Sequence, residues 1–178
     1  MIETARLVLR RWRKEDLGLL ESIHADPEVA YWLGGPIFAA LRANAIERIE
    51  AHFEAHGFGE WAIQRKDDRA LIGLAGLRRT TLPKSPEMGT VEIGWRLARW
   101  AWGQGYAAEA AHAALRDGFE RIGLEEVMSW TAETNRRSRG VMRRIGLKRR
   151  PRLDFDHPEL EEDHPLRRHV VYGARRQL

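Results

Sequence analysis

The sequence predicts a single α/β domain with a mixed, mostly antiparallel sheet that contains one central parallel pair of strands. Strand and helix patterns succeed one another along the whole chain, and no linker or internal repeat interrupts them. Residues 90–132 indicate a strand, a glycine turn, a helix and a second strand, the order of a right-handed crossover between parallel strands. The length of 178 residues suits one domain, 1–178, and 43% apolar residues are enough for a core.

The first part of the chain shows the hydrophobic periodicity of one strand and three helices. Asp26-Pro27 breaks the first helix, and Pro27 can occupy the first position of the next. Gly57 is suited to cap the last of the three. In order, we expect a strand over Arg6–Trp12, a helix over Lys14–Ala25, a short helix from Pro27 to about Leu33, a turn over Gly34–Pro36 and a helix over Phe38–His56.

The middle of the chain changes to the period of two that is typical of strands. Gly73 and Gly76 indicate that one of these strands is weakened or bulged. We expect strands over Gly59–Arg65, Leu71–Arg79 and Thr90–Ala98, a turn over Lys66–Arg69 and a loop over Thr81–Gly89.

The last part returns to helices and then to strands. Alanines in the helix after the glycine turn would let it pack close to a sheet, and Asn135 and Gly146 are suited to begin and end the next helix. We expect a helix to about Ile122, a strand over Val127–Ala132, a helix from Asn135 to Gly146, and strands over Leu147–Phe155 and His169–Ala174 around a loop over Asp156–Arg167.

Composition excludes several classes of protein. The chain has no cysteine, so disulfides and thiolate metal sites are ruled out. Its charged start does not resemble a signal peptide, and no apolar run approaches the roughly 20 residues of a membrane span. We therefore expect a cytoplasmic protein that does not enter a membrane. The net charge of +4 is mild, although a basic run from Arg136 to Arg152 could face phosphate.

The stretch Trp102-Gly103-Gln104-Gly105-Tyr106-Ala107-Ala108 joins a predicted strand to a predicted helix. Glycine permits a sharp turn and a close approach of a ligand to the peptide N–H groups. The first turn of a helix adds unpaired N–H groups and the positive end of the helix dipole. Together these features predict a cradle for the phosphates of a nucleotide-containing cofactor.

Two other interpretations of this stretch remain open. The letters also fit a dinucleotide-binding fingerprint, with Glu125 and Glu126 about 20 residues further on. However, these acids open the next strand, and too little chain remains for a doubly wound sheet. The stretch could also be a helix start that binds no ligand.

The element order together with this glycine stretch resembles the GCN5-related N-acetyltransferase (GNAT) family, and most closely its RimJ/RimL-like branch. Other segments carry the resemblance in the right order and cover nearly the whole chain. They are Thr4-Ala5-Arg6-Leu7-Val8-Leu9-Arg10, Val91-Glu92-Ile93-Gly94-Trp95, Asn135-Arg136-Arg137-Ser138 and Arg144-Ile145-Gly146-Leu147. The resemblance implies the GNAT acyl-CoA N-acyltransferase fold, whose central parallel strands splay apart around the cofactor.

The resemblance implies acetyl-CoA as co-substrate and no metal. Gly105 and Ala107 match the small positions of the family's phosphate loop, and Trp102 replaces its usual Gln or Arg. Leu97 matches the strand position that binds the pantetheine arm through its backbone, and a backbone N–H from the Trp95–Leu97 region would contact the thioester oxygen. The cofactor-binding residues implied are Trp95, Leu97, Trp102, Gly103, Gln104, Gly105, Tyr106, Ala107, Asn135, Ser138 and Arg139.

Two residues are candidates for the catalytic chemistry. Glu92 could accept a proton from the attacking amine as general base, although a strand glutamate can simply face solvent. Ser138 could protonate the departing thiolate, since the tyrosine that many relatives use is absent after Gly146-Leu147. Asn135 and Ser138 could instead serve only to cap a helix.

The acidic loop contains His157 and His164, and His169 follows it. These histidines could attract a cationic amine or supply a second base. A metal site is disfavoured because no fixed two-histidine spacing appears, and a solvated loop is also consistent.

These features predict an N-acetyltransferase that moves acetyl from acetyl-CoA to a primary amine, such as a protein N-terminus or a small amine, by direct attack in a ternary complex. The alternative is a non-catalytic coenzyme A-binding module on the same fold. Nucleic acid is not an expected partner, because few aromatics interleave with the basic run. The resemblance also implies that the chain can form a homodimer.

Overall fold

The computed structural model describes residues 1–35, 44–80 and 89–176. Within them, one nine-stranded sheet has the order β1-β2-β3-β4-β5-β6-β9-β7, and β8 pairs with β9. The strands are β1 (Ile2–Glu3), β2 (Leu7–Arg10), β3 (Glu60–Arg65), β4 (Leu71–Arg79), β5 (Val91–Leu97), β6 (Glu126–Ala132), β7 (Lys148–Arg149), β8 (Phe155–Asp156) and β9 (Arg168–Arg175). The helices are α1 (Leu17–Ala25), α2 (Pro27–Trp32), α4 (Ala45–His56), α5 (Tyr106–Glu120) and α6 (Arg136–Arg144).

Helices cover the sheet because each buries one apolar side. The small residues of α5 lie directly on β4 and β5, and a Cβ added to Gly118 would come within 2.5 Å of Leu77 Cδ1. Leu77 pairs with Ile93, so both side chains point to the α5 face of the sheet. Even-numbered residues of β5 point the other way, and Arg96 meets His24 of α1 there.

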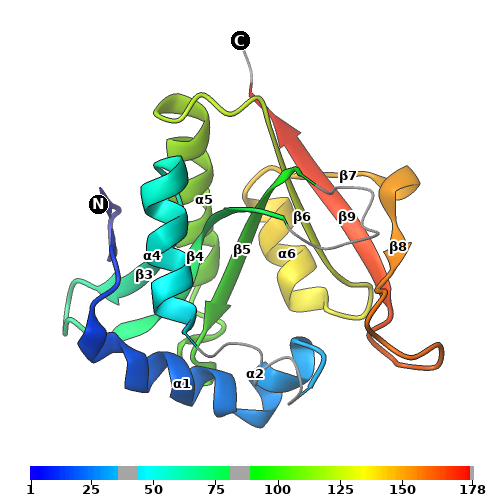
Figure 1. Cartoon of the computed structure of the whole chain (residues 1–178), viewed down its shortest axis with the longest axis horizontal. Helices are drawn as coiled ribbons and strands as arrows, with labels where there is room; N and C mark the ends of the chain where they lie inside the picture. Colours follow the sequence, from blue (N-terminus) through cyan, green and yellow to red (C-terminus); the bar gives the residue numbers. More distant parts are fainter. Residues whose placement is uncertain (36–43, 81–88, 177–178) are drawn as a thin grey trace.

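The parallel pair expected between 90 and 132 is present as β5 and β6, and the other strand pairs are antiparallel. These two strands pair at a single position, Glu92 with Met128. Just beyond it, Ser129 Oγ donates a hydrogen bond of 2.8 Å to the Ile93 carbonyl. The strands then diverge toward their carboxyl ends, as Figure 1 shows. The mixed, mostly antiparallel sheet is confirmed, with an opening in its middle.

Local signals located most elements within a few residues. Gly57 ends α4 with φ 73°, as its capping role requires. The predicted bulge is also present, because the pairing with β3 shifts from Ile63–Gly73 to Gln64–Leu71. Gly73 has φ 147°, and a Cβ there would lie 2.1 Å from the Arg96 carbonyl oxygen. Only glycine suits that position.

One predicted element is wrong and one was missed. The single strand over Leu147–Phe155 is broken into β7, a 3₁₀ turn over Pro151–Leu153, and β8. Pro151 lacks an N–H to donate and begins that turn, so the ladder is interrupted. The two-residue strand β1 was too short to show periodicity.

Some predicted features lie outside the described residues. These are Pro36 of the first turn, residues 38–43 of the long helix and residues 81–88 of the loop. No helix in the parts of the chain that the structure describes is both long and apolar enough to cross a bilayer.

Candidate functional site

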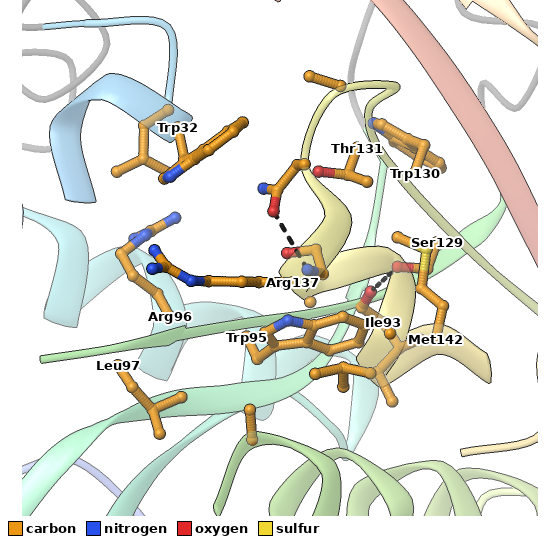
Figure 2. Close-up of a pocket in the computed structure, with 18 of the residues that line it drawn as sticks. Trp32, Ile93, Trp95, Arg96, Leu97, Ser129, Trp130, Thr131, Arg137 and Met142 are labelled. Carbon is orange, nitrogen blue, oxygen red and sulfur yellow. Dashed lines mark hydrogen bonds between the residues drawn. The ribbon is translucent and has the colours of Figure 1, made fainter. Parts of the chain in front are cut away.

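A cavity of about 790 Å³ occupies the opening between the diverging strands. Its walls come mainly from β5, β6, α2, α6 and the amino-terminal end of α5, with further residues from β3, β4, α4 and the segment 157–169. In Figure 2, Trp32 and Arg96 lie on one side of it, Thr131 and Trp130 on the other, and Trp95 between them. Segments far apart in the sequence therefore build one pocket, because the strands separate instead of pairing.

The edge of β5 presents backbone groups to this cavity. Ala98 N donates to Ile72 O and Thr80 N donates to Thr90 O, each at 2.9 Å. The backbone N–H and C=O groups of the even-numbered residues in this segment are therefore directed toward β4. In an antiparallel ladder the odd-numbered residues then direct their N–H and C=O to the other side. That side is the opening, and Trp95 and Leu97 stand along it. The Leu97 carbonyl accepts a hydrogen bond of 2.9 Å from Trp102 Nε1.

The glycine loop forms the open start of α5. Gly103 and Gly105 have φ of 77° and 82°, a conformation that favours glycine. A Cβ added to Gly103 would meet nothing within 4 Å, so a ligand can approach the backbone there. The loop residues that line the cavity are Trp102, Gly103, Gly105, Tyr106 and Ala107. Gln104 is not among them, and its Nε2 donates to Trp100 O at 3.0 Å.

Arg6 braces this loop from outside the cavity. Its Nε donates to Glu109 Oε2 at 2.7 Å, and its Nη1 donates to the Gln104 carbonyl at 3.0 Å. The guanidinium also lies 4.5 Å from the centre of the Tyr106 ring. The sequence indicates Arg6 only as part of the opening motif, since 98 residues separate it from Gln104 along the chain.

The start of α6 forms the wall beside this loop. Asn135 is buried, and its Oδ1 accepts a hydrogen bond of 3.1 Å from Ser138 N. The capping role of Asn135 is therefore confirmed. Both residues also line the cavity. Arg139 does not, and its Nη1 donates to the Glu133 carbonyl at 2.8 Å.

Glu92 lies on the cavity with only 6% of its surface exposed, so the solvent-facing alternative does not hold. Arg78 Nη2 is 2.6 Å from Glu92 Oε2 and provides the paired charge. Burial raises the pKa of Glu92, and Arg78 opposes that rise. A buried carboxylate with a raised pKa is a better proton acceptor than an exposed one.

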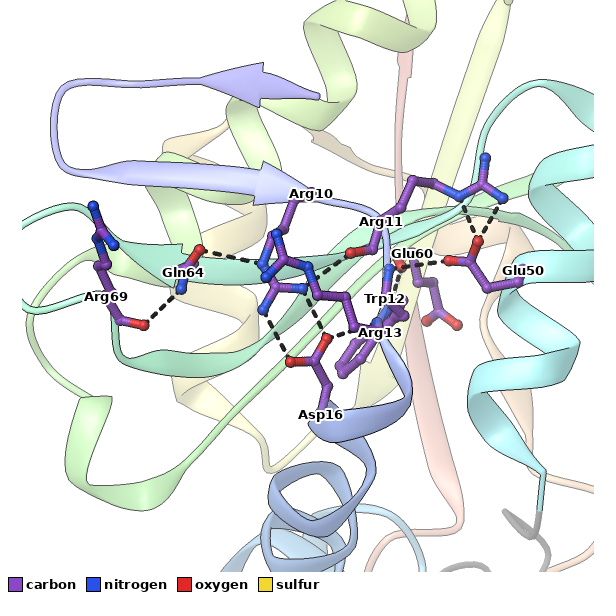
Figure 3. Close-up of polar contacts among 9 residues, drawn as sticks. All are labelled: Arg10, Arg11, Trp12, Arg13, Asp16, Glu50, Glu60, Gln64 and Arg69. Atoms are coloured by element: carbon purple, nitrogen blue, oxygen red, sulfur yellow. Dashed lines mark hydrogen bonds and ion pairs between the residues drawn. The ribbon is translucent and has the colours of Figure 1, made fainter.

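Glu60 and Arg96 were not singled out from the sequence, but they share this face of the sheet with Glu92. Both line the cavity. The Glu60 backbone carbonyl accepts from Trp12 Nε1 at 2.8 Å, while Figure 3 shows the Glu60 carboxylate turned away from that bond. Alternation within each strand could have placed these side chains on a face, but only the register brings them together.

Two of the three predicted histidines lie together on the cavity, and the third does not. His157 and His169 line the cavity with ring centres 5.1 Å apart, and His164 does not line it. His164 Nδ1 instead accepts from Leu166 N at 3.1 Å. Burial lowers the pKa of His157, and it lowers the pKa of His169 to about 4. Within residues 1–35, 44–80 and 89–176, no group of three His, Cys, Asp or Glu side chains could hold a metal ion.

Known proteins share both this sequence pattern and this fold. Residues 6–148 match the family model described as acetyltransferase (GNAT) domain. The FsC-acetyl coenzyme A-N(2)-transacetylase of Aspergillus fumigatus is 33% identical over 152 residues, which cover 82% of this chain and 64% of that relative's length.

Solved structures agree with the fold. The crystal structure of the acetyltransferase from Agrobacterium tumefaciens str. C58 has a TM-score of 0.74 at 28% identity and covers 97% of this chain and 92% of its own. RimL, a ribosomal L7/L12 alpha-N-protein acetyltransferase solved in complex with coenzyme A, also has a TM-score of 0.74, with 97% and 95% coverage. Its identity of 13% makes this a likeness of fold alone.

Proposed function

Because the chain belongs to the GNAT acetyltransferase family, we propose that it transfers an acetyl group from acetyl-CoA to a primary amine by direct attack. The observation that carries the proposal is the opening between β5 and β6, where an exposed strand edge meets two helix amino-termini. An opening of this kind can hold a long, phosphate-bearing molecule and a second reactant at once.

Coenzyme A fits the polar groups of this opening. The backbone N–H groups from Gly103 to Ala107 would hold its pyrophosphate at the start of α5, where Gly103 leaves room for it. The edge of β5 at Trp95 and Leu97 would bind the pantetheine arm. Asn135 and Ser138 would flank the thiol end. When bound, acetyl-CoA supplies an activated acetyl group as a thioester.

Glu92 takes the proton in this proposal. The acceptor amine must lose a proton before or during its attack, and a buried carboxylate within reach, or one water away, can accept it. Burial raises the pKa of Glu92, which favours this role, and the Arg78 charge opposes that rise and so favours the carboxylate form.

Two further groups complete the proposed chemistry. Backbone N–H groups of Trp95 and Leu97 would stabilise negative charge that develops on the thioester oxygen. The Ser138 hydroxyl would donate a proton to the departing thiolate. A thiol with an ordinary pKa of about 8.5 leaves readily, so Ser138 contributes less than Glu92.

We place the chain in the RimJ/RimL-like branch, in a cytoplasmic setting where acetyl-CoA is supplied. The opening motif at Thr4–Arg10 supports this placement. The N(2) in the name of the Aspergillus relative agrees with transfer to nitrogen.

The test is thiol release from acetyl-CoA with a panel of peptides, diamines and amino acids. Glu92→Gln should lower kcat by roughly 100- to 10,000-fold on the best acceptor, because the base is lost while the size is kept. Glu120→Gln, on the exposed side of α5, is the matched control and should leave kcat unchanged. Full activity in Glu92→Gln would remove the base assignment. Binding of acetyl-CoA with no acetylation across the panel would favour a non-catalytic coenzyme A module.

A further inference from the structure

The floor of the cavity on the β5 side carries two charges, Glu60 and Arg96, that the proposed reaction does not use. Glu92, Gly94 and Arg96 alternate along β5, so all three face the same way. Glu60 reaches this floor from β3, and its Oε1 lies 4.0 Å from the place that a Cβ on Gly94 would take. Nothing else lies within 4 Å of that point. Open space therefore stands above Gly94, between carboxylates and a guanidinium.

Among the described residues, two of the charges on this floor form an ion pair with each other, and the other two form none. Arg78 and Glu92 are in contact at 2.6 Å. Among the described residues, the Glu60 carboxylate has no hydrogen bond or ion pair, and Arg96 has no carboxylate within 4.0 Å.

Arg96 is held by a neutral contact. Its Nη1 is 2.7 Å from His24 Nε2, and that ring nitrogen can accept the bond only when it carries no proton. Its Nε is buried with no hydrogen-bond partner in the part of the chain that the structure describes. Burial lowers the pKa of Arg96 to about 10, although Glu60 opposes the fall. A half-buried guanidinium without a charged partner among the described residues can bind an anion from the cavity, and a carboxylate is the partner that fits its geometry.

From this arrangement we infer that the acceptor is a small zwitterionic amine, with a carboxylate that binds Arg96 and an amino group that lies over Gly94 between Glu60 and Glu92. The inference rests on the proposed function, because the amino group is the one that is acetylated. Glu60 attracts the ammonium form, and Glu92 takes its proton.

The size of the floor bounds the molecule. Glu92 and Arg96 are four residues apart on one strand, which separates their Cα atoms by roughly 13 Å. Glu92 contacts Arg78 and Arg96 contacts His24, so the ligand must reach both across the open space above Gly94. A short molecule with an amino group at one end and a carboxylate at the other, such as an amino acid, matches these two charges. A polyamine or an unmodified peptide amino-terminus offers Arg96 no carboxylate at this place.

Paired acceptors test the inference. Glycine, alanine, leucine and lysine are each compared with the corresponding α-carboxamide, which keeps the amine and the shape but loses the negative charge of the α-carboxylate. In thiol-release assays with acetyl-CoA, kcat/KM of the preferred acid should exceed that of its carboxamide by at least about tenfold, as expected for a charged hydrogen-bonded pair.

Arg96→Leu should remove this preference. We expect the ratio of kcat/KM for the acid to kcat/KM for the carboxamide to fall by about tenfold or more, whatever change the loss of the Arg96 charge near Glu92 makes to both acceptors alike. Activity on the carboxamide also shows that the variant is folded. Arg96→Lys keeps the charge and should retain part of the preference. Arg116→Leu makes the same change on the exposed side of α5 and should alter neither acceptor.

The outcomes separate the two proposals. Carboxamides used as well as the acids, or an equal loss on both in Arg96→Leu, would overturn the inference and leave amine acetylation standing. If no acceptor releases thiol, the protein saturated with coenzyme A is titrated with the same acids and carboxamides. Tryptophan fluorescence reports their binding. Tighter binding of the acids that is lost in Arg96→Leu supports the zwitterion site without the transfer. Equal binding, or none, overturns it.

Discussion

Arg6 and Glu109 join the first segment of the chain to the first turn of α5, with Arg6 Nε 2.7 Å from Glu109 Oε2. Thr4 Oγ1 donates to Glu109 Oε1 at 2.6 Å, and Arg6 N donates to the same oxygen at 2.9 Å. Burial alone would raise the pKa of Glu109, but these hydrogen bonds hold it below its ordinary value. The negative charge at the helix start is thus satisfied by protein, which leaves the glycine loop free for a phosphate.

Arg6→Ala should weaken the binding of acetyl-CoA. The loop loses its bond to the Gln104 carbonyl and its contact with Tyr106, so its N–H groups are held less firmly. We expect KM for acetyl-CoA to rise by roughly 3- to 10-fold, about 1 kcal/mol, with a smaller change in kcat. Steady-state kinetics at saturating amine measures this effect.

Two other variants identify the cause. Arg6→Lys keeps the positive charge but cannot make the forked contact, so it should resemble Arg6→Ala if bracing matters more than charge. Lys66→Ala removes an ion pair to Glu3 on the same edge of the sheet and should have no effect. Wild-type KM in Arg6→Ala would show that the loop holds its shape without the brace.

Arg78→Met should shift the acid side of the pH–rate profile. Burial raises the pKa of Glu92 and the Arg78 charge opposes that rise, so removal of Arg78 leaves the pKa higher still. If the carboxylate form of Glu92 is the base, kcat/KM falls as pH drops through that pKa. The fall should therefore begin at higher pH in Arg78→Met than in wild type. An unchanged profile would argue against Glu92 as the titrating group.

His169 should make the fold less stable in acid. Burial lowers its pKa to about 4, against an ordinary value near 6.5, and its Nδ1 lies 3.1 Å from the Arg167 carbonyl. The neutral ring is thus favoured in the folded state, and its contribution is complete above about pH 6.5. It is lost as pH falls from there toward 4, by an amount on the order of 2 kcal/mol.

Urea unfolding between pH 8 and pH 4.5 measures this loss. His169→Phe keeps a ring to stack on Phe155, whose centre is 5.4 Å away, but cannot take up a proton. Its stability should depend less steeply on pH than that of wild type. His112→Phe, at an exposed position of α5, should follow wild type. Equal slopes in His169→Phe and wild type would refute the assignment.

Local chemistry allowed much of this fold to be predicted. Positive φ occurs at Gly57, Gly103, Gly105 and Gly146. Glycine adopts this conformation readily, so a glycine in the sequence indicates such positions. Asn135 caps α6, as an asparagine before a helical pattern predicts. The failure over Leu147–Phe155 is also local, because Pro151 outweighed the alternation that suggested one strand.

The sequence by itself determined the element order, the glycine loop and the presence of Glu92 on the strand beside it, because turns, caps and periodicity depend on residues close together in the chain. Only the tertiary structure decided that Arg6 braces that loop, and that Glu60 and Arg96 share a floor with Glu92. These contacts depend on strand register and on how far β5 and β6 separate. Register is set by packing across the whole sheet, and the sequence of one strand does not specify how its neighbour is aligned with it.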